Sequence, residues 1–178
     1  MSVKNKIEGF RRIWQFDNRW QLIAWRIFFP HEPINIYRIG GIQMLADHSA
    51  GDANGAREVI ATPMYRKFFF GAMQLISPLK VLDIGAHNGG FPLLLKMLGY
   101  ELRKTVCVEM NPNTFLRLKY NIESNLRENC ILYNVAICGD GRELDLKLGS
   151  GSTGDSIYQN GHSQEATRAY KIKGNQYW

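Results

Sequence analysis

The sequence predicts an α/β protein built on a parallel sheet, and three observations predict it. Two short apolar runs, residues 80–83 and 105–108, lack the polar alternation of a strand with one solvated face. Each run is followed, after a short connection, by apolar residues at helical spacing. A glycine-containing turn separates the first run from its helix. Two such strand–helix units in succession form a parallel sheet with right-handed crossovers.

The length and composition of the chain are those of one globular domain. Its 178 residues can enclose a core, and 45% hydrophobic with 12% aromatic content excludes a disordered chain. No apolar run reaches the roughly 20 residues that span a bilayer, and no signal peptide is recognisable. The cysteines show no zinc-type spacing, so we expect no metal and three reduced thiols in a cytoplasmic protein. These thiols are Cys107, Cys130 and Cys138.

The first 33 residues are predicted to form an amphipathic helical extension, and residues 34–178 the main domain. Apolar residues recur at helical spacing across residues 5–29, with Asp17-Asn18 as a break. The first 30 residues hold six lysines and arginines against two acids, together with tryptophans. That pattern is typical of a helix lying on a membrane surface, here the inner membrane. The alternatives are a helix packed on the domain and a contact between two copies of the chain. The net charge of +6 comes with no nucleic-acid motif, so we expect no nucleic-acid partner.

The next segment, up to the first strand of the parallel sheet, is predicted to hold a hairpin, a loop and a helix. Residues 34–46 alternate around the turn Gly40-Gly41, which indicates the hairpin. Residues 48–57 are rich in loop formers. Thr62-Pro63 then predicts an N-cap and a first helical position, and Ser77-Pro78 ends this helix.

The parallel sheet and the tail follow. Gly99 is expected to end the helix after the first strand, and Asn111-Pro112 to begin a helix that runs to about Ser124. Residues 130–133 predict a third strand. Residues 143–148 alternate as an exposed strand does, and residues 169–173 could form another.

The chemistry is predicted at the carboxyl ends of the first two parallel strands. Asp83 ends the first strand, and the turn from Gly85 to Gly89 lets backbone approach a ligand closely. Glu109 ends the second strand, where a carboxylate can accept hydrogen bonds from both ribose hydroxyls. His87 stands where a nicotinamide enzyme has the glycine that admits a diphosphate, which makes such an oxidoreductase the weaker alternative. An acid before the turn suits a phosphate-free ligand with a cationic end, such as S-adenosylmethionine.

At these residues the chain resembles the FkbM family of class I S-adenosylmethionine-dependent methyltransferases. The run Asp83–Gly89 is similar to the family's first motif, and the resemblance extends over residues 36–169. It implies a Rossmann-like parallel sheet with helices on both faces, and S-adenosylmethionine as the cofactor. It also implies O-methylation of a sugar, polysaccharide or similar hydroxyl acceptor. Further matches are Glu109-x-Asn111-Pro112, Asn121-Ile122, Asn134-Val135-Ala136 and Gly139-Asp140.

The resemblance also implies roles for single residues. Asp83, Gly85 and Gly89 would line the methionine end of the cofactor, Glu109 the ribose, and Met110 with Ala136 the adenine. No catalytic base is identified, and His87 either shapes the turn or contacts the substrate. The residues predicted to bind the cofactor are Asp83, Gly85, Ala86, His87, Asn88, Gly89, Phe91, Glu109, Met110, Asn111 and Ala136.

The family continues beyond residues 169–173 into the second half of the sheet, which this sequence lacks. We therefore expect an incomplete domain in which the strand at residues 80–83 lies at an edge. An unpaired apolar edge favours pairing with another chain, so the domain is either a fragment or is completed by a partner such as a second copy. A non-catalytic module that acts through a partner is the alternative function.

Overall fold

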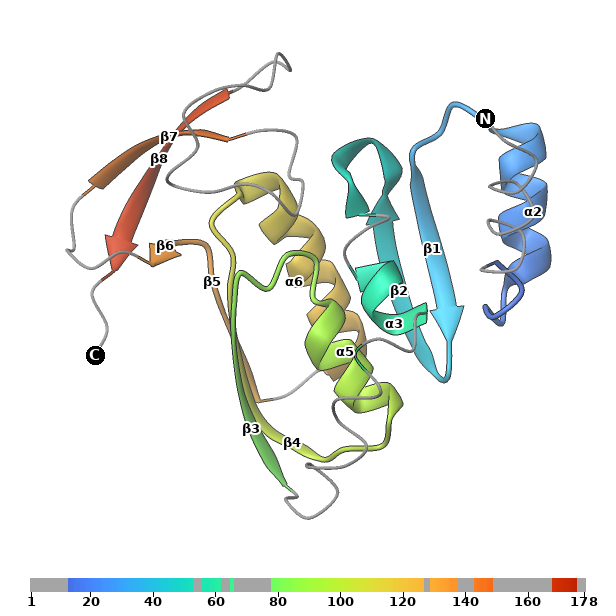
Figure 1. Ribbon diagram of the computed structural model, residues 1–178, viewed down its shortest axis with the longest axis horizontal. Coiled ribbons are helices and arrows are strands. Elements are labelled where there is room, and N and C mark those ends of the chain that lie inside the picture. The colour runs from blue at the N-terminus through green and yellow to red at the C-terminus, as the bar shows by residue number, and fades with distance from the viewer. Residues whose placement is uncertain are drawn as a thin grey trace.

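The computed structural model describes residues 13–52, 56–61, 65, 78–126, 129–137, 143–148 and 168–175. Its strands form three sheets, with helices between and beside them (Figure 1). The strands are β1 (Ile34–Ile39), β2 (Ile42–Asp47), β3 (Leu79–Ile84), β4 (Leu102–Val108), β5 (Cys130–Tyr133), β6 (Ala136–Ile137), β7 (Glu143–Leu148) and β8 (Arg168–Asn175). The helices are α2 (Arg19–Phe28), η1 (His48–Ala50), α3 (Ala56–Ala61), α5 (Gly90–Met97) and α6 (Pro112–Leu126).

The predicted parallel sheet is confirmed. It has the order β3-β4-β5, with both pairs parallel, and Ile84, Val108 and Tyr133 are in register at its carboxyl end. Within the described residues β3 pairs with β4 alone, so β3 lies at an edge as expected. The tail also forms strands where they were predicted, with β8 between β6 and β7.

The two faces of the parallel sheet differ. Leu79 and Val81 of β3 are buried, whereas Leu82 and Ile84 are 56% and 50% exposed. The described helices α5 and α6 lie on one side of the sheet (Figure 1). The expectation that this strand is covered on both faces is therefore wrong for the described part of the chain. Residues 62–64 and 66–77, which include most of the helix predicted before β3, lie outside the described residues.

Several helix ends and turns that were predicted from short stretches of sequence are confirmed. The Asn111 side chain accepts hydrogen bonds from the backbone N–H groups of Asn113 and Thr114 at 3.0 and 3.4 Å, so it caps α6 as predicted. Gly40 and Gly41 both have positive φ and close the β1–β2 hairpin. Helix α2 begins directly after the predicted break at Asp17-Asn18.

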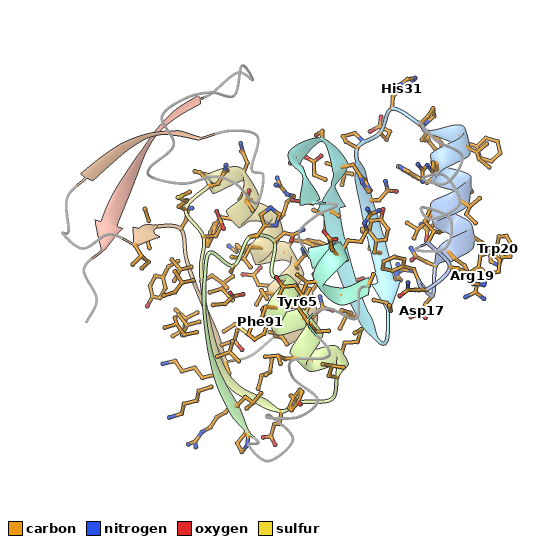
Figure 2. All side chains as sticks on the ribbon, viewed as in Figure 1. Asp17, Arg19, Trp20, His31, Tyr65 and Phe91 are labelled. Carbon is orange, nitrogen blue, oxygen red and sulfur yellow. The ribbon has the colours of Figure 1, made fainter. Side chains whose placement is uncertain are left out.

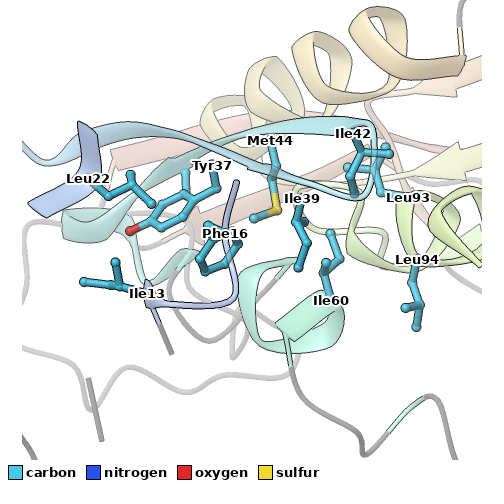
Figure 3. Packing of buried hydrophobic residues seen from close by; sticks show 11 residues of the cluster. Ile13, Phe16, Leu22, Tyr37, Ile39, Ile42, Met44, Ile60, Leu93 and Leu94 are labelled. Carbon is cyan, nitrogen blue, oxygen red and sulfur yellow. The ribbon is translucent and has the colours of Figure 1, made fainter. Parts of the chain in front are cut away.

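The largest hydrophobic cluster joins the N-terminal segment to the hairpin and to α5 (Figure 3). The ring of Phe16 packs on that of Tyr37, with centroids 4.8 Å apart. Leu22 of α2 and Leu93 of α5 belong to the same cluster, so α2 is anchored on the hairpin. The domain boundary at residue 33 stays a prediction. The buried members are Ile13, Phe16, Leu22, Tyr37, Ile39, Ile42, Met44, Ala46, Ile60, Leu93 and Leu94.

The free edge of β2 is covered by asparagine side chains of α6. Asn121 Oδ1 accepts from the N–H of Leu45 at 2.7 Å, and Asn121 Nδ2 donates to the Leu45 carbonyl at 3.0 Å. Asn125 makes the same pair with Gln43, at 2.9 and 2.6 Å. Each amide thus replaces the peptide group of a neighbouring strand, which protects the edge from pairing with another chain.

We predict that Asn121→Ala lowers the free energy of unfolding by about 2–4 kcal/mol, because it leaves both backbone groups of Leu45 without this partner. Urea-induced unfolding measures the change. Glu123→Ala is the matched control, since Glu123 is an exposed residue of the same helix. Equal stability of the two variants would show that the asparagine contact is dispensable.

Candidate functional site

The turn between β3 and α5 folds back on the end of β4. The backbone N–H groups of Gly85 and Ala86 both donate to the Val108 carbonyl at 2.9 Å. Gly85, His87 and Gly89 have φ values of +76°, +50° and +88°. Such a conformation is strained for a residue with a Cβ, so His87 must be held there by its neighbours.

Glu109 supplies one of these restraints. Its Oε2 accepts from the backbone N–H of His87 at 2.9 Å, and its Oε1 accepts from that of Asn111 at 2.8 Å. The residue is 7% exposed, and its own N–H donates to the Tyr133 carbonyl at 3.0 Å. One carboxylate therefore joins the turn after β3 to the turn after β4.

Asn134 adds the third strand to this arrangement. Its Nδ2 donates to the carbonyls of Glu109 and Met110, at 2.8 and 3.1 Å. The segments that follow β3, β4 and β5 are thus connected by side chains at one end of the sheet. This is the end at which open α/β sheets bind their ligands.

Asp83 differs from Glu109, because one oxygen of its carboxylate is buried without a partner. Asp83 Oδ2 makes no hydrogen bond among the described residues. Burial, together with a smaller contribution from the nearby charge of Glu109, raises the pKa of Asp83 to about 6. A cationic or hydrogen-bond-donating ligand at this carboxylate would compensate its burial.

Two glycines of the turn serve different purposes. A Cβ placed on Gly85 would meet no atom within 4 Å, so there is open space beside it. A Cβ on Gly89 would lie 3.1 Å from Leu118 Cδ1 and 3.2 Å from Ile122 Cδ1. The small size of Gly89 is therefore required by the packing of α5 against α6, and that of Gly85 leaves room for a ligand.

The structure brings most of the predicted binding residues together but gives several of them packing roles. Asp83, Gly85, Ala86, His87, Glu109, Met110 and Asn111 lie in the linked strand-end segments. The carbonyl of Asn88, which is fully buried, accepts from Asn121 Nδ2 at 2.8 Å. Phe91 packs beside Leu79, Val81 and Leu95. Ala136 is 2% exposed and pairs with Gly174 of β8.

A buried ion pair between Asp52 and Arg117 lies next to the turn and was not predicted from the sequence. Arg117 Nε lies 2.7 Å from Asp52 Oδ2, and its Nη2 donates to Asp52 Oδ1 at 3.1 Å. Asp52 is fully buried and also accepts from the N–H of Asp47. His87 Nε2 lies 3.6 Å from Asp52 Oδ1, and His87 Nδ1 lies 3.0 Å from Asn88 Oδ1. The ion pair thus connects the segment after β2 to α6 and to the turn.

One signal in the sequence could have indicated this arrangement. Arg117, Asn121 and Asn125 recur at helical spacing beside Leu118 and Ile122, so they share the apolar side of the predicted helix. Polar residues on a buried side need buried partners. The identity of those partners was not readable from this pattern.

The thiol nearest to the site is unsuited to nucleophilic chemistry. Burial raises the pKa of Cys107 to about 12, with further contributions from Asp83 and Cys130. A thiol with so high a pKa is protonated at neutral pH and unreactive. Among the described residues, no group of three His, Cys, Asp or Glu could hold a metal ion.

Comparison with known proteins gives distant structural likenesses. No family model matches the sequence, and no curated protein matches it. One similar solved structure is the complex of aTrm5 with tRNALeu, at a TM-score of 0.41 and 18% identity. Another is the tRNA (uracil-54, C5)-methyltransferase of Pyrococcus abyssi in complex with S-adenosyl-L-homocysteine, at a TM-score of 0.41 and 17% identity.

The matched regions cover 63% and 65% of this chain but only 34% and 26% of those two chains. The matched regions thus span about a third or less of the length of either protein.

We predict that Asp83 makes the protein less stable as the pH rises from about 4 to about 6. The folded protein holds the Asp83 proton up to a higher pH than the unfolded chain does, because burial raises the pKa to about 6. This difference lowers the free energy of unfolding by about 3 kcal/mol once Asp83 is deprotonated in both states. Asp83→Asn should remove this loss and be the more stable protein at pH 7 in urea unfolding. The prediction would be contradicted if the free energy of unfolding of the wild type rose over this pH range and that of Asp83→Asn rose with the same slope.

We predict that Asp52→Asn lowers the free energy of unfolding by about 3–5 kcal/mol, because it leaves the buried Arg117 guanidinium without its counter-charge. Thermal and urea unfolding measure the loss. The double variant Asp52→Asn with Arg117→Met should recover part of the lost stability, since the change at Arg117 removes the unpaired charge. A double variant less stable than either single variant would contradict this explanation.

Proposed function

We propose that this chain is the cofactor-binding part of an S-adenosylmethionine-dependent methyltransferase of the FkbM type. The observation that carries the proposal is the partner-free, buried oxygen of Asp83, and the open space at Gly85, two residues further along the chain, supports it. An unpaired carboxylate at the carboxyl end of a parallel strand favours a ligand with a cationic end. The ammonium group of S-adenosylmethionine is such an end.

The residues present fit this cofactor. Asp83 would hold the amino group of its methionine part, with the backbone of Gly85 alongside. Glu109 would take the ribose hydroxyls and Met110 the adenine. Bound there, the cofactor supplies a methyl group on a sulfonium, which is already a good leaving group. The work of the chain is therefore to position the cofactor and to exclude water.

His87 supports the methyltransferase proposal over the nicotinamide alternative. It occupies the middle of the turn with a side chain that faces Asp52 and Asn88. A diphosphate needs a glycine at this place for close approach. The same two contacts favour a role for His87 in holding the turn rather than as a general base. The base for a hydroxyl acceptor is then expected outside the described residues.

The acceptor proposed is a sugar, polysaccharide or similar hydroxyl compound. This part of the proposal comes from the resemblance to the FkbM family alone. A non-catalytic module that pairs with another chain is the second candidate, and it is favoured by the edge position of β3 and the exposed Leu82 and Ile84. Both candidates would bind the cofactor, but only the methyltransferase would transfer its methyl group to an acceptor.

We predict that isothermal titration calorimetry detects binding of S-adenosylmethionine and of S-adenosylhomocysteine. Asp83→Asn should weaken binding by about tenfold or more, because hydrogen bonds to charged groups contribute about 1.5–3 kcal/mol. Gly85→Val should weaken it by filling the open space beside the turn. Lys80→Gln, an exposed change on the same strand, should leave it unaltered.

Three outcomes would count against the proposal. Equal affinities of wild type and Asp83→Asn would remove Asp83 from the site. Binding of NADH in a fluorescence titration, with none of S-adenosylmethionine, would favour the oxidoreductase instead. Cofactor binding without methyl transfer to any hydroxyl acceptor would favour the non-catalytic module.

A further inference from the structure

Helix α2 has apolar residues on two sides, and only one of these sides is packed. Leu22 is 6% exposed and lies in the cluster with Tyr37 and Ile39 of the hairpin. Trp20 and Ile27, which are two turns apart on another side of the helix, are each 65% exposed. Figure 2 shows Trp20 pointing away from the hairpin into the surroundings.

These exposed residues, together with Trp14 before the helix, form a surface that we call the aromatic patch, which comprises Trp14, Trp20, Ile27 and Phe28. Each member is at least half exposed, and Phe28 reaches 73%. Trp14 and Trp20 make an edge-to-face contact with centroids 5.4 Å apart. Large apolar groups gathered on a surface in this way mark a site of interaction.

The charges around the patch indicate what it contacts. Helix α2 contains Arg19 and Arg26 and no acid, and the nearest acids, Asp17 and Glu32, flank it in the sequence. The Arg19 guanidinium lies over the Trp14 ring, 5.4 Å from its centroid. The first 30 residues hold six lysines and arginines against two acids. Arginine with tryptophan is the combination that suits the boundary between anionic headgroups and acyl chains.

We propose that the aromatic patch docks on the surface of an anionic bilayer. At ten residues α2 is about 15 Å long, which is half of a bilayer's hydrocarbon thickness. None of the described helices is long and apolar enough to cross a membrane. The helix would therefore lie in the interface with Trp20 and Ile27 inserted and its arginines at the headgroups.

The patch and the candidate cofactor site lie on different sides of the hairpin. Figure 1 shows α2 beside β1 and the parallel sheet beyond α6. Docking through α2 would leave the strand ends of β3 and β4 uncovered. The membrane contact is therefore compatible with ligand binding and is independent of the proposed function.

The test is co-sedimentation of the full chain with vesicles of phosphatidylcholine, with and without phosphatidylglycerol. We expect binding to the mixed vesicles, weakening as salt is added, and a blue shift of tryptophan fluorescence. Trp20→Ser with Ile27→Ser should weaken partitioning by about tenfold or more, because two large apolar groups no longer enter the interface. Leu116→Ser is the matched control, since Leu116 is 66% exposed on α6, away from the patch. Arg26→Gln should weaken binding to the anionic vesicles.

Several outcomes would overturn the proposal. One is the absence of vesicle binding by the wild-type chain, and another is equal binding by the double variant and the Leu116→Ser control. A stable dimer in sedimentation, broken by Trp20→Ser with Ile27→Ser, would assign the patch to a second copy of the chain instead. The changed residues are exposed, so unaltered circular dichroism is expected for every variant and shows that a loss of binding is not a loss of fold.

Discussion

The geometry of the candidate site depends on one buried carboxylate. Glu109 accepts a backbone N–H from the turn after β3 and another from the turn after β4, at 2.9 and 2.8 Å. A buried charge is tolerated only when it is hydrogen-bonded, and bonds to a charged acceptor are the stronger kind. Through these bonds Glu109 holds His87 at a positive φ and keeps the two strand ends in one arrangement. A loss of ligand binding on removal of Glu109 would therefore mix a loss of fold with a loss of contact.

The carboxylates of Asp83 and Glu109 differ in the hydrogen bonds that the fold gives them. The Glu109 carboxylate is bonded to the protein's own backbone, whereas Asp83 keeps an oxygen without a partner and with a raised pKa. Arrangements that lower stability without serving the fold are concentrated at functional sites. The nearby charge of Glu109 disfavours the ionised form of Asp83, and a cationic ligand beside Asp83 would favour it.

The parts of the structure that the sequence predicted are those specified by neighbouring residues. The Asn111-Pro112 cap and the Gly40-Gly41 hairpin act within four residues, so local chemistry decides them. The pair of Asp52 with Arg117 spans 65 positions, and nothing near either residue identifies its partner. In the described part of the chain the second face of β3 is exposed, contrary to expectation, because an apolar run shows that a strand can be buried and does not show what covers it.

Helix α6 fixes the hairpin relative to the site, and its geometry explains how. Asn121 and Asn125 are four residues apart on a helix, a rise of about 6 Å, and Leu45 and Gln43 are two residues apart on a strand, about 6.7 Å. The two amides therefore match two consecutive free peptide groups of β2, and a slip of the strand by one residue would leave them facing the wrong groups. On the same helix, Leu118 and Ile122 pack beside Gly89 of the turn. Directional bonds and close packing on the same side of α6 thus hold the hairpin, with α2 anchored on it, in a set position relative to the strand ends.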